Sequence, residues 1–214
     1  MLILVFDTET TGLHSRPKPS YNNTKQWPHI IQLSYVLYET TKFKIVKCVD
    51  NIIRLDDIVE ISEESINVHG ITRTISKRKG IDIKVAINEF MDDLQKVECI
   101  VGHNLQFDKD MIIVETVRMN NMKMFTNLKE YCTMKNGKTM CNIKKVSFTG
   151  EPYLKYPRLI ELHEKIFNKI PNGVHDSLAD VLICLRCYIK MTTNVDIRKK
   201  KCNIFNELYG LYCD

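Results

Sequence analysis

Long apolar runs, a leader segment and internal repeats are missing from this sequence of 214 residues. No apolar stretch approaches the ~20 residues that a membrane-spanning helix needs. The N-terminus opens directly into a predicted strand, without a basic segment followed by an apolar one and a cleavage site. We therefore expect an intracellular protein, cytoplasmic or nuclear, that is not secreted and has no membrane partner. Without repeats or low-complexity stretches, the length suits one domain of ordinary size.

A zinc site is also missing, although the chain has eight cysteines. Cys184 and Cys187 are separated by two residues, but they lie in an amphipathic helical pattern, and no second close Cys/His pair completes a zinc site. We interpret the cysteines as reduced thiols in a reducing compartment. The formal net charge of +5 fits a surface that binds a polyanion but does not require one.

An acidic strand tip is the feature around which the sequence is organised. Residues 2–6 are large and apolar, which is typical of a strand buried on both faces. Asp7 and Glu9 follow, and because side chains alternate along a strand, both point to the same face. Two like charges held close together repel unless a cation lies between them, so the pair favours a site for a hard divalent metal, Mg²⁺ or Mn²⁺. The alternative is a solvated strand end whose Asp7 caps the following turn.

The order of apolar patterns predicts an α/β domain with a mixed sheet. Strands at 30–38 and 44–54 follow the first at short range, which indicates an antiparallel meander. Later single strands alternate with helices, as in parallel sheets; the strands are expected at 99–102 and 128–133, and the helices at 62–67, 82–96, 105–122, from about 157, and at 176–191. The polar stretch 137–149 is ambiguous.

Two more acids and a histidine lie near predicted helix starts. Asp108 is one turn into the helix that follows the strand 99–102, so it lies at the carboxyl edge of the sheet, and Asn104 can cap that helix. Asp180 lies beside the apolar stripe of the last strong helix, where an acid needs a partner, and His175 on the preceding loop can converge on the same point. The alternatives are an acid favoured by a helix dipole, a partly exposed helix acid and a surface histidine.

Four carboxylates and one histidine suit metal-assisted phosphodiester chemistry. Two metal ions ~3.5–4 Å apart clamp the attacking and leaving oxygens of an in-line displacement at phosphorus. A histidine, with an unperturbed pKa near ~6.5, can accept the proton of the attacking water near neutral pH.

Three motifs carry a resemblance to a known family. They are the segments 6–13 (FDTETTGL), 103–108 (HNLQFD) and 175–180 (HDSLAD). With these motifs in this order, the chain resembles the DEDD 3′–5′ exonuclease superfamily, in its histidine-type branch, and looks like the epsilon proofreading exonuclease domains of bacterial replicative polymerases. The resemblance implies a ribonuclease H-like fold, with an exonuclease domain at 1–192 and a basic and apolar extension at 193–214.

The resemblance also implies roles for individual residues. Asp7, Glu9, Asp108 and Asp180 would be ligands of two Mg²⁺ or Mn²⁺ ions, with Asp7 bridging both, and His175 would be the general base. The residues that would contact the substrate are Thr8, Thr10, Gly12, Leu13, Glu64, His69 and Asn104. Within this set Leu13 would wedge against the last base and Glu64 would lie near the sugar, while His69 has the alternative of being an ordinary loop histidine. Ser177 stands where the family usually has alanine.

The function implied is a metal-dependent 3′–5′ exonuclease that releases nucleoside 5′-monophosphates from single-stranded, frayed or mismatched 3′ ends of DNA. The partner would be a nucleic acid with a free 3′ end, DNA ahead of RNA, and a DNA polymerase is a candidate partner. One alternative is an exoribonuclease that trims short RNA, since the residues that would contact a 2′-OH are not legible. Another is a non-catalytic nucleic-acid-binding or polymerase-associated subunit, which loss of a metal ligand would have favoured.

Two segments depart from compact relatives. The predicted loop 14–28 borders the expected site, where it could influence strand choice or block duplex entry. The tail 196–214 could pack on the domain, bind a partner through its apolar stretch, or be loosely ordered. Its basic run 198–201 could contact phosphates, act as a nuclear address or be a plain solvated face.

Overall fold

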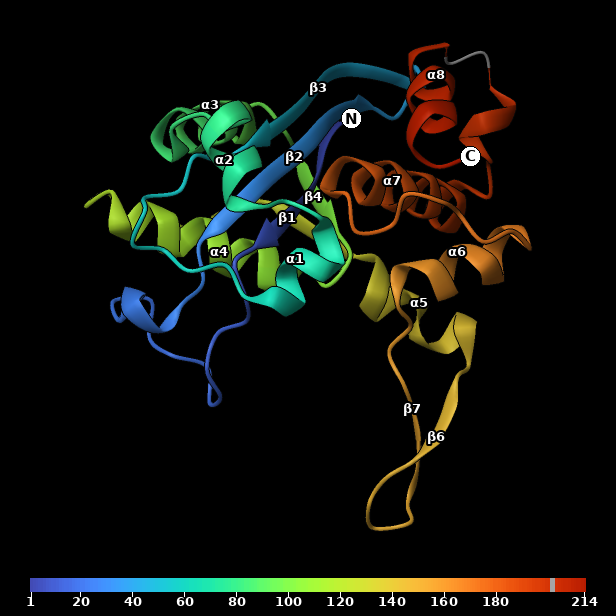
Figure 1. Ribbon diagram of the computed structural model, residues 1–214. Coiled ribbons are helices and arrows are strands. Elements are labelled where there is room, and N and C mark those ends of the chain that lie inside the picture. Colours follow the sequence, from blue (N-terminus) through green and yellow to red (C-terminus); the bar gives the residue numbers. More distant parts are fainter. Residues whose placement is uncertain (201–202) are drawn as a thin grey trace.

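A mixed five-stranded sheet forms the centre of the molecule (Figure 1). The structure is a computed structural model that describes residues 1–200 and 203–214. The strand order is β3-β2-β1-β4-β5, and the strands are β1 Leu2–Thr10, β2 Ile30–Glu39, β3 Lys44–Ile52, β4 Cys99–Gly102 and β5 Lys129–Cys132. β2 is antiparallel to β1 and β3, whereas β4 is parallel to β1 and β5. The predicted combination of an antiparallel meander and parallel strands is therefore confirmed.

Helices flank this sheet. They are α1 Glu63–His69, α2 Arg73–Lys79, α3 Ile83–Leu94, α4 Leu105–Arg118, α5 Thr133–Cys141, α6 Leu159–Phe167, α7 Ser177–Thr193 and α8 Asn203–Tyr212. A separate hairpin, β6 Lys144–Val146 and β7 Pro152–Leu154, lies between α5 and α6, and 3₁₀ turns lie at Thr24–Gln26 and Ile197–Lys199. Among the described residues, no helix is both long and apolar enough to cross a membrane.

The alternation of side chains on β1 separates two cores. Ile3 and Val5 pack into a cluster with α6, α7 and α8 on one face of the sheet. Leu4 and Phe6 pack into a second cluster with α3 and α4 on the other face. Because the odd-numbered residues face α7, the alternation carries Asp7 and Glu9 to the α7 side of the sheet and Thr8 to the α4 side.

Several local predictions need correction. Asn104 does not cap α4: it adopts a left-handed backbone with φ 68°, and its side chain accepts no bond from the described residues of the first turn. α4 ends at Arg118 instead of near 122, and β3 ends at Ile52 instead of 54. The ambiguous stretch 137–149 contains the second half of α5 and the strand β6 of the hairpin. Its Gly137 lets α6 approach, because a Cβ there would lie 2.7 Å from Cδ1 of Leu162.

The loop at 14–28 is fixed to α4. Nη2 of Arg118 donates to the carbonyls of Thr24 and Trp27, each at 2.8 Å, and the indole of Trp27 is buried. Tyr21 donates its hydroxyl to Oδ1 of Asp110 at 2.7 Å. The loop is therefore a well-anchored border of the sheet edge where β1 ends.

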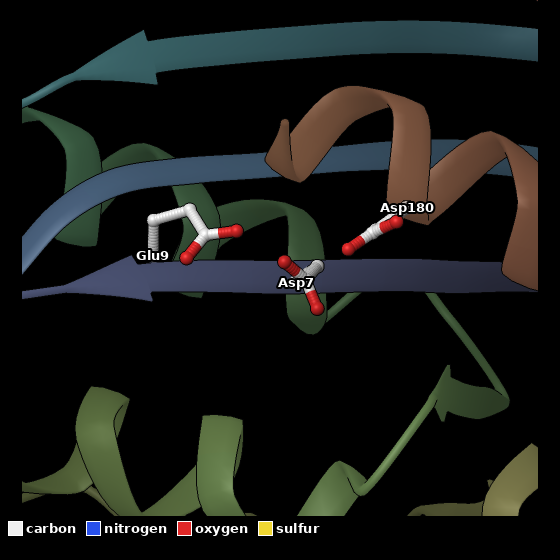
Figure 2. Close-up of side chains that lie close together, drawn as sticks. All are labelled: Asp7, Glu9 and Asp180. Atoms are coloured by element: carbon white, nitrogen blue, oxygen red, sulfur yellow. The ribbon is translucent and has the colours of Figure 1, made fainter. Parts of the chain in front are cut away.

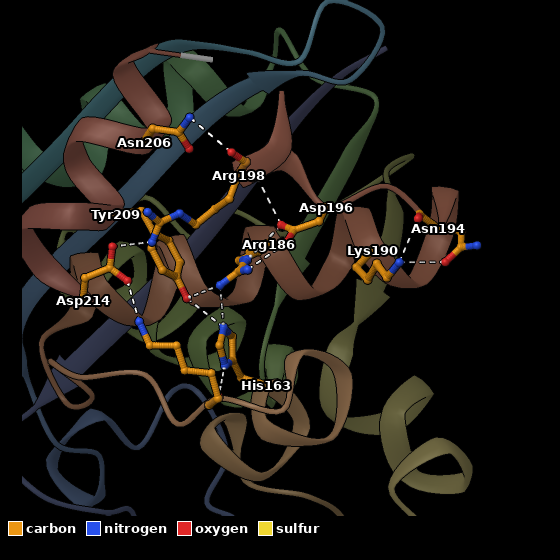
Figure 3. A network of polar contacts seen from close by, with 10 residues as sticks. His163, Arg186, Lys190, Asn194, Asp196, Arg198, Asn206, Tyr209 and Asp214 are labelled. Carbon is orange, nitrogen blue, oxygen red and sulfur yellow. Dashed lines mark hydrogen bonds and ion pairs between the residues drawn. The ribbon is translucent and has the colours of Figure 1, made fainter. Parts of the chain in front are cut away.

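The tail packs on the domain. Phe205, Tyr209 and Cys213 of the α8 region are buried in the core that also contains α7. Polar contacts around Arg186 of α7 join the tail to α6 (Figure 3). Seven cysteines are described, and none of these forms a disulfide. Cys202, the eighth, and Lys201 of the basic run lie outside the described residues.

Candidate active site

Three of the predicted acids meet at one point above β1. Asp7 and Glu9 come from β1 and Asp180 comes from the first turn of α7 (Figure 2). One carboxylate oxygen of each lies within 4.8 Å of the others. All three are partly buried. Asp7 and Glu9 thus point to the same face of β1, as predicted, and Asp180 of the helix that covers this face joins them.

The start of α7 is attached directly to β1. Asp176 caps the helix, its Oδ1 accepting from the backbone N–H of Ala179 at 3.1 Å. The next residue, Ser177, is buried and donates its hydroxyl to the carbonyl of Asp7 at 2.8 Å. Asp180 follows one turn later, so the cap and this bond together set its carboxylate over the strand tip. The serine that stands where alanine is usual thus supplies a contact that alanine lacks.

Asp108 lies apart from the group of three. It is buried on α4, and its Oδ1 accepts from both the backbone N–H of Thr8 at 3.1 Å and the Thr8 hydroxyl at 2.8 Å. This placement follows from strand alternation, because Thr8 faces α4 while its neighbours Asp7 and Glu9 face α7. Its charge still acts on Glu9, where it helps to raise the pKa.

Burial and mutual repulsion make these acids hard to ionise. Burial, followed by the charge of Asp176, raises the pKa of Asp7 to about 7, against a lowering hydrogen bond from Ser177. Burial and the charges of Asp7, Asp180, Asp108 and Asp176 raise the pKa of Glu9 to about 9. The pKa of Asp180 is also raised, first by burial and then by Asp7. A cation among these carboxylates would relieve both causes.

The residues fit a divalent metal ion. Oδ1 of Asp180 is buried and has no hydrogen-bond partner among the described residues. An unpartnered buried carboxylate oxygen is costly unless it has a ligand. Oxygen donors of this kind are those that hard divalent cations prefer. Asp7, Glu9 and Asp180 could therefore hold one ion, and Asp108 lies near enough to influence the site electrostatically.

His175 lies at the mouth of this site. It is exposed, its backbone is left-handed with φ 75°, and its N–H faces Oδ2 of Asp180 at 3.4 Å. Together with Asp7 and Asp180 it lines a cavity of about 400 Å³. The loop position that the sequence predicted for His175 thus brings it to the same cavity as two of the acids.

The end of the chain supports the loop that carries His175. Asn172 donates its backbone N–H to the carbonyl of Cys213 at 3.0 Å and its side-chain Nδ2 to the carbonyl of Asp214 at 2.6 Å. Gly173 has φ 70°, and a Cβ there would lie 2.0 Å from the carbonyl oxygen of Tyr212. Only glycine permits this close approach, so the tail and the loop fit directly against each other.

The predicted substrate residues at the end of β1 differ in exposure. The hydroxyl of Thr8 is committed to Asp108, and the hydroxyl of Thr10 donates to the carbonyl of Gly12 at 2.7 Å. A Cβ on Gly12 would meet nothing within 4 Å, so the backbone there is open to a ligand. Leu13 is 82% exposed, so its side chain is free to contact a ligand, as a wedge would be.

Glu64, His69 and Asn104 lie on separate elements. Glu64 is exposed on α1 and Asn104 is exposed at the start of α4. His69 ends α1, where its Nδ1 accepts from the N–H of Ile71 at 3.0 Å. Burial lowers the pKa of His69, and the nearby backbone of Thr10 acts in the opposite direction. Nε2 of His69 is buried and has no hydrogen-bond partner among the described residues. His69 thus lies beside the strand end, and the structure assigns no contact that distinguishes a substrate role from a structural one.

Two residues near the acids had no predicted role. Asp176 belongs to the motif at 175–180, and its charge raises the pKa of Asp7. His103 also lines the cavity, and its Nε2–H donates to the carbonyl of Pro157 at 3.0 Å while Nδ1 pairs with the hydroxyl of Thr133 at 3.0 Å. Burial lowers the pKa of His103 to about 4, so it is neutral and holds the cavity wall. A capping signal at Asp176 was available in the sequence, whereas the partners of His103 are remote.

A second, larger cavity of about 620 Å³ lies between the start of β2, the end of β3 and α3. Its charged lining residues have both signs, among them Arg54, Asp56, Lys77 and Glu115. It contains none of the residues that the motifs predict. The smaller cavity, which is lined by Asp7, Asp180 and His175, is therefore the candidate site.

Comparison with known families agrees with this placement. A family model described as Exonuclease (RNase T) matches residues 4–188. The chain belongs to the exonuclease family. Its resemblance to the DEDD 3′–5′ exonuclease superfamily is thereby confirmed. No sequence among curated proteins matches the chain.

Solved structures share the fold. E. coli exonuclease I in complex with a dT13 oligonucleotide superposes with a TM-score of 0.67 at 17% identity, covering 97% of this chain and 43% of that protein. The same enzyme with a dA16 oligonucleotide gives 0.65 at 17% identity, covering 98% and 43%. Exonuclease I from Methylocaldum szegediense gives 0.63 at 15% identity, covering 92% and 42%. This chain thus spans less than half the length of these relatives, and at such identities the likeness establishes the fold.

Proposed function

We propose that the chain is a metal-dependent 3′–5′ exonuclease that hydrolyses phosphodiester bonds at the 3′ end of DNA and releases nucleoside 5′-monophosphates. The observation that carries the proposal is the meeting of Asp7, Glu9 and Asp180, with His175 on the rim of the same cavity. Family membership supports the reaction class. The E. coli exonuclease I structures with dT13 and dA16 support single-stranded DNA as the substrate.

The three carboxylates would hold Mg²⁺ or Mn²⁺, and Asp108 would complete a second ion position after its bond to Thr8 rearranges. Bound metal ions supply charge stabilisation to the attacking and leaving oxygens of an in-line displacement. Ser177 fixes the strand tip against α7, so the carboxylates are held in place before substrate arrives.

His175 would take the proton of the attacking water on its imidazole. It is exposed at the cavity mouth, so solvent reaches it, and its N–H bond to Asp180 fixes its backbone beside the acids. Leu13 would pack against the last base, and the open backbone at Gly12 would allow the 3′ end to approach. These contacts do not depend on base identity, which suits an enzyme that removes one nucleotide after another from a 3′ end.

The test uses 5′-labelled oligonucleotides with Mg²⁺ and, separately, Mn²⁺. The substrates are single-stranded DNA, matched duplex, 3′-mismatched duplex and RNA, and the Asp7→Ala protein and an EDTA-treated sample run alongside. We expect a ladder that shortens from the 3′ end of DNA, is faster at mismatches and is absent in the variant and with EDTA.

Other outcomes redirect the proposal. A ladder on RNA alone would make the protein an exoribonuclease. Release of the 5′ label as the first product would reverse the polarity. Full activity in EDTA would defeat the metal-dependent mechanism, and no ladder on any substrate would leave a nucleic-acid-binding protein that retains its acids.

A further inference from the structure

The hairpin β6–β7 extends away from the rest of the molecule (Figure 1). β6 pairs antiparallel with β7, and Lys145 lies opposite Tyr153 in the register. Its tip is closed by its own hydrogen bonds: Ser147 donates its N–H to the carbonyl of Glu151 at 2.9 Å and Gly150 donates to the carbonyl of Ser147 at 3.0 Å. Two-stranded hairpins are marginal in water. A defined hairpin that adds little to the core therefore invites a functional explanation.

The segment between β5 and α6 carries the net charge of the protein. Residues 133–158 contain six basic side chains and one acidic one, so their net charge is +5, which equals that of the whole chain. The rest of the chain therefore balances, with 25 basic and 25 acidic residues left from totals of 31 and 26. Within the segment, Lys144 and Lys145 are exposed and have no ion-pair partner in the part of the chain that the structure describes. A positive potential concentrated on one arm favours a polyanion.

Exposed aromatic and apolar side chains lie close to these lysines on the hairpin. Phe148 at the tip is 108% exposed, Val146 is 68% exposed and Tyr153 is 49% exposed. No packing in the fold accounts for a phenylalanine placed fully in water. Exposed aromatic rings next to lysines are the two components of a single-strand binding surface, because rings stack on bases and ammonium groups pair with phosphates.

The arm is continuous with the candidate active site. From β7 the chain runs directly into Tyr156 and Arg158, which line the same cavity as Asp7, His175 and Asp180. The hairpin turns back at 147–151, where Ser147 bonds to Glu151, so the residues that extend along the arm are those from Tyr156 back to Glu151. At ~3.3 Å per residue these five steps span roughly 17 Å. With at least ~3.4 Å per nucleotide, that length accommodates about five nucleotides.

We propose that the β6–β7 hairpin is a second binding site for single-stranded nucleic acid, in which Lys144 and Lys145 contact phosphates and Phe148 and Tyr153 stack on bases. This rests on the proposed function for its direction: the 3′ end occupies the acidic cavity, and the strand on the 5′ side follows the hairpin. The arm attracts a polyanion that the bare acids repel. It lengthens the contact with the substrate without taking part in the chemistry.

Binding without turnover tests the arm by itself. Fluorescence anisotropy in EDTA measures the affinity of labelled single-stranded dT oligonucleotides of three and 15 nucleotides for the wild type and for Lys144→Gln/Lys145→Gln/Phe148→Ala. A matched control, Lys42→Gln/Lys44→Gln/Ile58→Ala, removes two exposed lysines and an exposed apolar side chain elsewhere on the surface. We expect the hairpin variant to lose at least about fivefold in affinity for the longer strand from the lost stacking alone. The slope of log affinity against log salt should fall by about 1.4 for two lost phosphate contacts.

The expected pattern is specific to length and to the hairpin. The three-nucleotide strand should bind with the same affinity in all proteins, and the control should match the wild type. Equal losses in both variants, an unchanged salt slope, or a wild type that binds long and short strands equally would each overturn the proposal. The binding assay in EDTA does not depend on turnover. If the protein cleaves no oligonucleotide in Mg²⁺ but still shows length-dependent binding through the hairpin, the proposed function is refuted and the binding role of the hairpin is supported.

With Mg²⁺ present, the same variants separate binding from chemistry. The hairpin variant should raise KM for the 15-nucleotide strand by a factor similar to its loss in affinity, with kcat unchanged. A fall in kcat on the short substrate as well would show that the hairpin shapes the active site and is not a separate binding arm. Circular dichroism melting of both variants checks that the fold is intact.

Discussion

Two clusters of charged side chains, each with a member on α7, follow opposite rules. In the cluster around Arg186, opposite charges are paired: the residue is 8% exposed, and its Nε and Nη2 donate to the two carboxylate oxygens of Asp196 at 3.0 and 2.8 Å (Figure 3). Its Nη1 donates to Nε2 of His163 at 3.1 Å and to the hydroxyl of Tyr209 at 3.2 Å. In the cluster over β1, the groups brought together are all acids.

The pKa values show what this difference means. Burial raises the pKa of Asp196, but hydrogen bonds and the charge of Arg186 outweigh it, and the net pKa is lowered. For Asp7 burial is reinforced by Asp176, and the pKa rises to about 7. Ionisation therefore stabilises the fold at the first cluster and destabilises it at the second. A protein keeps a destabilising cluster where a ligand or a reaction needs it.

The largest effect should come from removing one of the like charges. Asp7→Asn should abolish turnover, because the central carboxylate of the three is lost. The same change removes a repelled, desolvated charge, so the metal-free protein should gain about 1 kcal/mol, or roughly 2–4 °C in melting temperature for a chain of this size. End-labelled digestion and calorimetry at pH 8 in EDTA measure the two effects. Unfolding of the variant would instead assign Asp7 a structural role.

The next effect concerns the residue at the rim of the unpaired cluster. His175→Ala should lower kcat by roughly 10²–10⁴-fold if the imidazole is the general base. Melting temperature should not change, since the side chain is exposed. The decisive measurement is the pH–rate profile at saturating metal. If the variant keeps the wild-type profile, His175 has no part in proton transfer.

The paired cluster should respond in the reverse way. Arg186→Leu leaves the partly buried Asp196 without its guanidinium partner, although the N–H of Arg198 still donates to it, and should lower the free energy of unfolding by at most about 3 kcal/mol. Turnover at 20 °C should fall far less than in Asp7→Asn. The double variant Arg186→Leu/Asp196→Leu is the control, because removing both charges should recover much of the loss. A double variant as unstable as the single one would indicate lost packing as the cause.

The sequence reveals these two clusters unequally. Asp7, Glu9 and Asp180 could be assigned because two of them share a strand, where alternation fixes the face, and the third begins a helix with a clear apolar stripe. The mixed sheet followed from the same short-range periodicities. The position of Asp108 beside Thr8 was missed, although the alternation that joins Asp7 to Glu9 places Thr8 on the other face.

The paired cluster has no such local signal. Arg186 interrupts the apolar stripe of α7, and its partners His163 and Tyr209 are each 23 residues away in the chain. No periodicity relates positions that far apart. The sequence therefore leaves packing, partner binding and disorder open for the tail. It does not predict α5, because the stretch 137–149 is polar and ambiguous, and the close packing of α6 that Gly137 permits involves residues remote in the chain. Three-residue strands such as β6 are too short for alternation to show.

The pH dependence of stability distinguishes the two clusters, because the acidic cluster loses stability as pH rises and the cluster around Arg186 loses stability as pH falls. Asp7 and Glu9 have pKa values raised to about 7 and about 9 in the folded protein. Their contribution to the free energy of unfolding is therefore fully present below ~4, the pKa of these acids in the unfolded chain, and is lost as pH rises through 7 to 9. His163 has a pKa lowered to about 4, mainly by burial, so its contribution is present above ~6.5 and is lost as pH falls toward 4.

Melting temperature against pH, in EDTA and in Mg²⁺, measures both slopes. In EDTA we expect a maximum in mildly acidic solution and a decline toward pH 9. Mg²⁺ should remove the alkaline decline, since an ion that binds only the folded state adds stability in proportion to the logarithm of its concentration. Metal should leave the acidic limb unchanged. An equal effect of Mg²⁺ at pH 5 and pH 9 would contradict the assignment of the acids as its ligands.

The smallest effect should appear where the two clusters are joined. Asn172, three residues before His175, bonds to the carbonyls of Cys213 and Asp214, so the tail that the paired cluster holds also supports the loop that carries His175. One hydrogen bond contributes ~0.5–1.5 kcal/mol. If the lost hydrogen bond in Asn172→Ala displaces His175 by the same free energy, kcat should fall about two- to tenfold.

Lys169→Met is the matched control, because Nζ of Lys169 also contacts Asp214, at 2.9 Å, but lies further from His175 along the chain. A loss of kcat in Asn172→Ala alone, with equal melting temperatures in both variants, would show that the tail held by the Arg186 cluster positions His175. Equal losses of kcat in both variants would show that the contacts between the tail and this loop contribute only to general stability.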